Sequence, residues 1–282
     1  MSDVFQQQKL HDLLFINTWM SKWNGLVAGF TTRLGGFSEE PFLSNNMGLH
    51  VDDNEQHVIR NRQQLCQHLS FPFESFTCAQ QVHSNKVQVV TYKERGRGRL
   101  SAQDAIQDTD GIITNESNIL LTSFYADCVP LLFVDPIKKV VALAHAGWKG
   151  TVEAIAKQTI DLMQAQYQCE AQSIYAAIGP SIGQCCYEVD KRVIDAVHVL
   201  WDKEQLPKHL LETCIRPINE LKALINLKEI NRQIMIKAGI LSSNIEISKL
   251  CTGCSTDLFF SHRIEGGKTG RMASFIGWQE RT

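Results

Sequence analysis

The sequence predicts an α/β fold of the α+β type, a mixed-sheet sandwich with flanking helices that forms a single domain over residues 1–282. Strand-length apolar runs and longer amphipathic segments follow one another in irregular alternation, unlike a regular βαβ series. A hydrophobic fraction of 44% and a charged fraction of 21% are ordinary for a globular protein. A chain of 282 residues is long enough to bury a sizeable core.

Short apolar runs bounded by turn residues predict the strands. Val87 and Val89 alternate with polar neighbours, and the dipeptide Asp135-Pro136 predicts a turn between two neighbouring strands. The predicted strands are 25–32, 86–92, 111–114, 119–122, 131–134, 140–144, 173–178, 245–247 and 271–276.

Helical periodicity and capping residues predict four helices, at 53–69, 151–166, 190–201 and 221–238. The first carries apolar side chains at Val58, Leu65 and Leu69, which fall on one face. Thr151 is the expected N-cap of the second helix, and Gly239 is expected to end the fourth.

Charge and cysteine usage exclude several classes of partner. A net charge of −2 gives no electrostatic reason for binding nucleic acid or an anionic membrane. The polar segment 1–14 lacks the apolar run of a secretory leader, and no stretch has the length of a membrane span. Nine cysteines, an odd number, argue against a disulfide framework. We therefore expect a cytoplasmic protein, and a monomer, since no long apolar stripe is left over.

Three segments place one potential metal ligand each where a strand meets a loop: 80–85 (QQVHSN), 125–130 (YADCVP) and 144–150 (AHAGWKG). Their ligands, His83, Cys128 and His145, would leave a fourth tetrahedral position free, as in catalytic zinc sites. Thiolate and imidazole favour zinc or copper over magnesium or calcium. The residues alone leave the alternative open that both histidines are structural and that the cysteine fills the core.

The pair Cys251 and Cys254 has the spacing of half a structural zinc site. No second C-x-x-C or H-x-x-x-H pair completes it, although Cys185 and Cys186 could contribute in space. The missing half favours a structural or packing role.

Two arginines lie beside small or turn residues, Arg33 in 31–36 (TTRLGG) and Arg263 in 259–263 (FFSHR). A guanidinium in such a place can hold an oxyanion through two hydrogen bonds. A surface salt bridge is the alternative role for each.

Ordered motifs along nearly the whole chain resemble the laccase-like family of multicopper polyphenol oxidoreductases. The same family is also described as purine nucleoside phosphorylases, and its bacterial members as peptidoglycan editing factors. The matching motifs are 29–36 (GFTTRLGG), 46–48 (NMG), 61–62 (NR), 81–83 (QVH), 110–111 (DG), 126–132 (ADCVPLL), 144–148 (AHAGW), 178–180 (IGP), 185–188 (CCYE) and 270–276 (GRMASFI).

The resemblance implies a mixed α/β sandwich with zinc at His83, Cys128 and His145. It also implies phosphorolysis of adenosine, inosine, guanosine and methylthioadenosine, and hydrolytic deamination of adenosine. The partners would then be purine nucleosides and phosphate.

Within that activity, four further residues have expected roles. Arg33 and Arg263 are the candidates for binding phosphate, and Asn46 for touching the ribose or the base. Asp127, beside the ligand Cys128, is the expected acid/base or the carboxylate that supports a ligand.

Two other functions remain open at this point. Cys128 could be the nucleophile of a Cys–His hydrolase that acts on cell-wall precursors. A true laccase needs many histidines, usually in H-x-H pairs, and this chain has nine histidines and no such pair. Weak oxidation by adventitious copper at the His₂Cys site is therefore the most that an oxidase activity would amount to.

Overall fold

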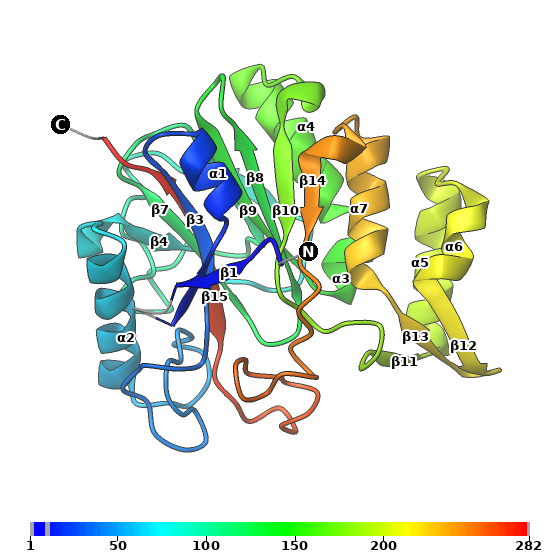
Figure 1. Ribbon diagram of the computed structural model, residues 1–282, viewed down its shortest axis with the longest axis horizontal. Coiled ribbons are helices and arrows are strands. Elements are labelled where there is room, and N and C mark those ends of the chain that lie inside the picture. The colour runs from blue at the N-terminus through cyan, green and yellow to red at the C-terminus, as the bar shows by residue number, and fades with distance from the viewer. Residues whose placement is uncertain (1–2, 9–11, 281–282) are drawn as a thin grey trace.

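The computed structural model describes residues 3–8 and 12–280; both ends of the predicted domain and part of the polar segment 1–14 lie outside the described residues. Two six-stranded sheets form the centre of the molecule (Figure 1). The first has the order β1 (Gln6–Gln8), β2 (Leu13–Phe15), β3 (Leu26–Thr31), β15 (Met272–Trp278), β7 (Leu120–Tyr125), β4 (Phe76–Cys78). The second has the order β14 (Ile245–Ile247), β10 (Tyr175–Ile178), β8 (Val129–Asp135), β9 (Val140–Ala146), β6 (Gly111–Thr114), β5 (Val87–Val89).

Both sheets mix parallel and antiparallel pairs. In the first, β4 pairs parallel with β7, whereas the remaining pairs are antiparallel. In the second, β5–β6 and β10–β14 are parallel. This arrangement confirms the predicted mixed-sheet α/β class.

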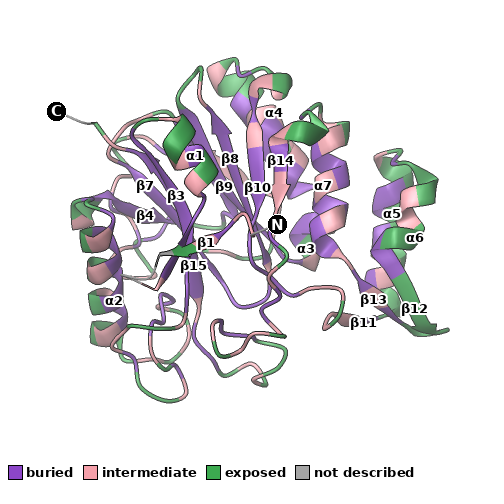
Figure 2. Cartoon of the chain, in the orientation of Figure 1, coloured by how far each residue is buried: buried purple, intermediate pink, exposed green. Residues whose placement is uncertain are grey.

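The helices of the described residues are α1 (Asn17–Lys22), α2 (Glu55–His68), α3 (Trp148–Val152), α4 (Ile155–Tyr167), α5 (Lys191–Lys203), α6 (Lys208–Cys214) and α7 (Leu227–Lys237). Helices α2, α4 and α7 cover the outer faces of the two sheets. Leu65 and Cys66 of α2 pack against the outer face of the first sheet. The buried faces of α4 and α7 pack against the outer face of the second sheet (Figures 1 and 2).

The core between the sheets is built from alternate residues of strands that are buried on both faces. Every residue of β8 and β9 is buried (Figure 2). Leu132 and Leu143 face the first sheet, where Phe30 and Ile276 meet them, while Leu131 faces the helices. The central hairpin therefore holds its ends in fixed positions.

The chain between β10 and α7 forms a third sheet of three strands, which lies to one side of the sandwich (Figure 1). It has the order β11 (Glu188–Asp190), β13 (Lys222–Ile225), β12 (Ile215–Asn219), and α5 and α6 lie beside it (Figure 1). Asp190 caps α5 by accepting from the N–H of Val193. Among the described residues, no helix is long and apolar enough to cross a membrane.

Two predicted helices differ from the structure. The segment 151–166 is divided into α3 and α4, because Ala154 adopts a left-handed conformation with φ of 57°. Thr151 is therefore no N-cap; it lies inside α3 and its hydroxyl accepts from the side chain of Asn231. The segment 221–238 begins as strand β13, and helix α7 starts only after Asn226 caps it by accepting from the N–H of Glu229.

Candidate metal centre and active-site cavity

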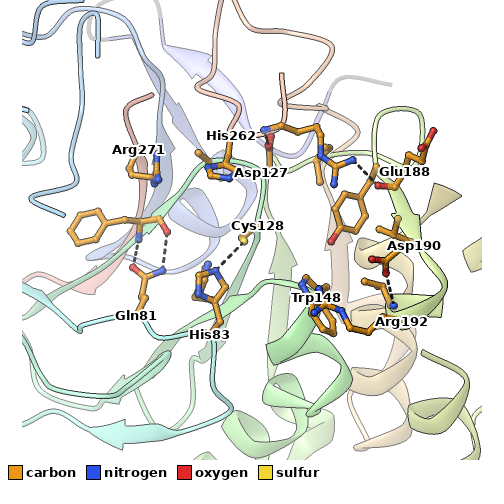
Figure 3. A pocket seen from close by; sticks show the side chains of 18 of the residues that line it. Gln81, His83, Asp127, Cys128, Trp148, Glu188, Asp190, Arg192, His262 and Arg271 are labelled. Atoms are coloured by element: carbon orange, nitrogen blue, oxygen red, sulfur yellow. Dashed lines mark hydrogen bonds between the residues drawn. The ribbon is translucent and has the colours of Figure 1, made fainter. Parts of the chain in front are cut away.

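His83, Cys128 and His145 lie together at one end of the sandwich. Cys128 directly precedes β8 and His145 is in β9, and the antiparallel register that pairs Pro130 with His145 places the two side by side. His83 reaches them from the loop after β4. The three ligand atoms lie within 4.8 Å of one another, and Cys128 Sγ is 4.0 Å from His83 Nε2 (Figure 3).

The buried carboxylate of Asp110 organises this cluster. Its Oδ1 lies 2.9 Å from His145 Nδ1 and 3.0 Å from the N–H of His83, which donates to it. The N–H and the hydroxyl of Ser84 donate to Oδ2 at 2.7 and 2.9 Å. Asp110 thus holds the loop that carries His83 and fixes the ring of His145, leaving His145 Nε2 free for a metal.

Charges within the cluster shift its pKa values. Burial raises the pKa of Cys128, but the charge and hydrogen bonds of His145 and His83 outweigh it and bring the value to about 6. Burial lowers the pKa of His145, but the Cys128 charge and the Asp110 hydrogen bond raise it to about 9. Although burial opposes ionisation of Asp110, its hydrogen bonds to His145 and Ser84 lower its pKa. Without a metal, the cluster is therefore a thiolate beside an imidazolium.

The donor set fits a zinc ion. Zinc at about 2.3 Å from sulfur and about 2.0 Å from nitrogen needs ligand atoms about 3.5 Å apart, so the 4.0 Å separation of Cys128 and His83 requires only a small contraction. A Cβ at Gly147 would lie 3.0 Å from both Cys128 Sγ and His83 Cδ2. A larger residue at this position would crowd two of the three ligands.

A cavity of about 670 Å³ opens on the cluster, within the size range of sites for small ligands. Aromatic and cationic side chains share its walls (Figure 3). The aromatic side chains are Phe124, Trp148 and Tyr187, and the cations are Arg192, Lys222, Arg263 and Arg271. A molecule with a flat apolar ring and an anionic group would find partners for both.

Asp127 lines this cavity, but its carboxylate is occupied by donors from a loop. Thr252 Oγ1 donates to Oδ1 at 2.6 Å, Ser261 Oγ at 2.8 Å, and the N–H of Arg263 donates to Oδ2 at 2.8 Å. The backbone of Asp127 has a φ of 84°, a strained conformation for an aspartate. The structure thus shows Asp127 anchoring the loop, and its acid/base role stays a prediction.

The predicted phosphate and nucleoside residues separate into two groups. Arg263 lines the cavity, lies over the ring of Tyr187 and donates to the Glu188 carbonyl at 2.6 Å. Arg33 forms a 3.0 Å ion pair with Glu265 and lies over Phe260, outside the residues that line the cavity. Direct contact of Arg33 with a substrate stays a prediction.

Asn46 is fully buried and also lies outside the lining. Its Oδ1 accepts from the N–H groups of Gly48 and Arg271, each at 2.9 Å. The side chain therefore positions the backbone of Arg271, which does line the cavity. Its contact with ribose or base stays a prediction too.

Sequence reasoning missed Asp110, His50 and Arg271 as site residues. For Asp110, the signal in the sequence is a carboxylate in the motif 110–111, directly before the predicted strand 111–114. Burial, with the charges of Arg271 and Arg62, lowers the pKa of His50 to about 4, so its ring is neutral at pH 7. His50 lies two residues after the motif 46–48, and Arg271 lies within the motif 270–276, which is the signal that could have found them.

The fold is a mixed α/β sandwich, and a candidate metal cluster lies at the mouth of its cavity. The chain belongs to the family described as multi-copper polyphenol oxidoreductase laccase, whose model matches residues 27–279.

Relatives in this family carry the name purine nucleoside phosphorylase. The chain is 44% identical to purine nucleoside phosphorylase YlmD of Bacillus subtilis over 90% of this chain and 89% of that protein. It is 32% identical to human purine nucleoside phosphorylase LACC1, covering 90% of this chain and 56% of the human protein. The crystal structure of YlmD from Geobacillus stearothermophilus superimposes with a TM-score of 0.92 at 42% identity, over 99% of this chain and 100% of that one.

Proposed function

We propose that this chain is a zinc-dependent purine nucleoside enzyme built as one domain. It would cleave adenosine, inosine, guanosine and methylthioadenosine with phosphate, and would deaminate adenosine. The observation that carries the proposal is the 670 Å³ cavity, which joins the His83/Cys128/His145 cluster to aromatic and cationic walls. The names of the relatives support the phosphorolysis of purine nucleosides within this proposal.

Different residues of the cavity would contact different parts of the substrate. Tyr187 and Trp148 offer ring faces to a purine, because base–aromatic stacking needs no particular base edge. Arg263 and Arg271 would hold phosphate against the ribose, since guanidinium groups bind oxyanions with paired hydrogen bonds. The neutral ring of His50 would offer one donor and one acceptor to the nucleoside.

His83, Cys128 and His145 would hold the zinc, and Asp110 would keep His145 in the tautomer that can ligate. When bound, zinc supplies the Lewis acidity that activates water for attack on a purine. Copper bound adventitiously at the same His₂Cys set is the alternative metal.

The test is turnover of adenosine with and without phosphate, combined with metal analysis. We expect zinc at the cluster, adenine formed only with phosphate, and inosine formed without it. His83→Ala should lower both rates by a factor on the order of 10³, the size of effect expected when an electrophilic group is lost. Gln80→Ala, in the same loop, is the control. A metal-free protein that turns over no purine would refute the proposal.

A Cys–His hydrolase is a second candidate, because Cys128, His145 and Asp110 also have the order of a nucleophile, a base and the group that orients the base. Iodoacetamide separates the two functions. A hydrolase nucleophile is alkylated at once, whereas a zinc-bound thiolate is protected until a chelator removes the metal.

We further propose a monomer that works in the cytoplasm on purine nucleosides and phosphate, and binds neither nucleic acid nor membranes. All nine cysteines are free thiols, which supports a reducing compartment. The elution volume of the purified protein on a calibrated sizing column tests the monomer.

A further inference from the structure

A second group of thiols lies outside the cavity. Cys185 and Cys186 occupy the turn that leads into β11, while Cys251 and Cys254 occupy the turn after β14 (Figure 1). Cys185 Sγ lies 3.5 Å from Cys251 Sγ and 3.4 Å from Cys254 Sγ, and Cys186 Sγ lies 3.4 Å from Cys254 Sγ. All four sulfurs lie within 4.8 Å of one another.

These separations suit one metal ion in the middle of the group. A zinc ion with four sulfurs at about 2.3 Å holds them about 3.8 Å apart, close to the spacing found here. The pairs at 3.4–3.5 Å are far wider than a covalent S–S bond of about 2.05 Å. Cys251 and Cys254 form half of a four-ligand site, and Cys185 and Cys186 from the other turn supply the second half.

Neighbouring groups favour a thiolate at Cys251 and allow the two turns to approach closely. The N–H of Gly183 donates to Cys251 Sγ at 3.1 Å. A Cβ at Gly253 would lie 3.0 Å from Cys186 Cβ and 3.2 Å from its Sγ, so a larger residue there would crowd the other pair of cysteines. The ammonium of Lys228, only 6% exposed, donates to the carbonyls of Ser248 and Leu250 just before Cys251, which places a cation beside the group.

Burial argues against a simple packing role. Cys185 and Cys254 are exposed and Cys186 is half-buried, whereas free cysteines that fill a core are buried. Exposed thiols that converge on one point gain nothing from the hydrophobic effect, so another interaction must account for their convergence.

We propose that Cys185, Cys186, Cys251 and Cys254 bind a structural zinc ion, independent of the ion at His83. Four protein ligands close the coordination shell, so this ion has no open position for chemistry. It ties the turn before Tyr187 to the turn that contains Thr252, and the chain continues from that turn to Arg263. Both segments form one wall of the cavity, and the second zinc would hold that wall in place.

The experiment counts metal ions in variants that separate the two sites. Protein purified with zinc should contain about two ions per chain, because each cluster supplies a full ligand set for one. His83→Ala should retain about one, and Cys254→Ser should also retain about one, at the other site. Ser255→Ala, which alters the neighbouring side chain and leaves all four thiols, should retain both.

Cobalt gives a readout that does not depend on folding of the cysteine variant. In His83→Ala protein, cobalt(II) should produce strong sulfur-to-metal charge-transfer absorption from the remaining tetrathiolate site. The proposal is overturned if His83→Ala binds no cobalt, if the wild-type protein holds only one zinc that His83→Ala removes, or if mass spectrometry of unreduced protein shows a disulfide within the group. None of these outcomes depends on purine turnover.

Discussion

The two candidate metal-binding clusters differ in their ligands and in what surrounds them. The His83/Cys128/His145 cluster has three ligands, a buried carboxylate behind it and a cavity in front. The cluster of Cys185, Cys186, Cys251 and Cys254 has four sulfurs, exposed turns and no residue among those that line the cavity. Ligand number and surroundings thus separate a site suited to chemistry from one suited to holding loops.

Replacing the Asp110 carboxylate should have the largest effect, and it should affect only one of the two clusters. We expect Asp110→Asn to weaken zinc binding at the His₂Cys cluster roughly 10- to 100-fold, because the hydrogen bond that orients His145 loses its charge. Zinc at the four cysteines should be unaffected. Competition with a chromogenic chelator measures both affinities.

A matched control is available in Asp135→Asn. Asp135 is equally buried, accepts from the N–H groups of Ile137 and Lys138, and lies at the far end of the β8–β9 hairpin. It should lower stability without changing either zinc affinity. Equal weakening of both metal sites in Asp110→Asn would mean that Asp110 acts through general stability.

Substitutions of Arg263 and Arg33 test whether the cavity wall next to the cysteine cluster binds phosphate. Arg263→Gln should raise the KM for phosphate about tenfold, since one charged hydrogen bond contributes roughly 1.5 kcal/mol. Arg33→Gln should leave that KM within about twofold, because Arg33 is paired with Glu265 away from the lining, where an exchange costs stability rather than binding. Steady-state kinetics at varied phosphate decides. The reverse pattern would return Arg33 to the phosphate site.

The strands next to Cys128 and His145 could be predicted from the sequence. The Asp135-Pro136 turn predicted neighbouring strands, and their register then brings Cys128 beside His145. The ligand set itself depended on the family resemblance, because His83 arrives from a distant loop that no local spacing announces. The role of Asp110 was missed because the partners of its carboxylate come from two segments that are distant in sequence, residues 82–84 and His145.

Local signals failed where tertiary contacts outweighed them. The segment 221–238 has helical periodicity, but residues 222–225 pair with both β11 and β12, so they form a strand. The cysteine cluster shows the same limit. Each half was visible in the sequence, but the convergence of the two turns depends on the bridge between Ser181 and Cys251.

In the metal-free protein, the thiols of the two clusters should differ in the pH at which they react. With the pKa of Cys128 at about 6, its thiolate should be alkylated by iodoacetamide at neutral pH, with a midpoint near pH 6. Desolvation and hydrogen bonds among the thiols raise the pKa of Cys185 to about 11, so that thiol should react only at alkaline pH. Peptide mapping after alkylation at several pH values distinguishes them.

The same pKa values predict how stability of the metal-free protein varies with pH. The lowered pKa of Cys128 contributes stability that is lost as pH falls through about 6. The raised pKa of His145 contributes stability that is lost as pH rises through about 9. The Cys128 contribution rises with pH over the range from about 6 to about 9, while the His145 contribution falls over the same range, so the two offset one another. Urea unfolding of chelator-treated protein at pH 5, 7.5 and 10 should therefore show a nearly flat profile. Cys128→Ser keeps only the contribution of the His145–Asp110 pair and should lose stability as pH rises; a flat profile in the variant would place the ionic contribution elsewhere.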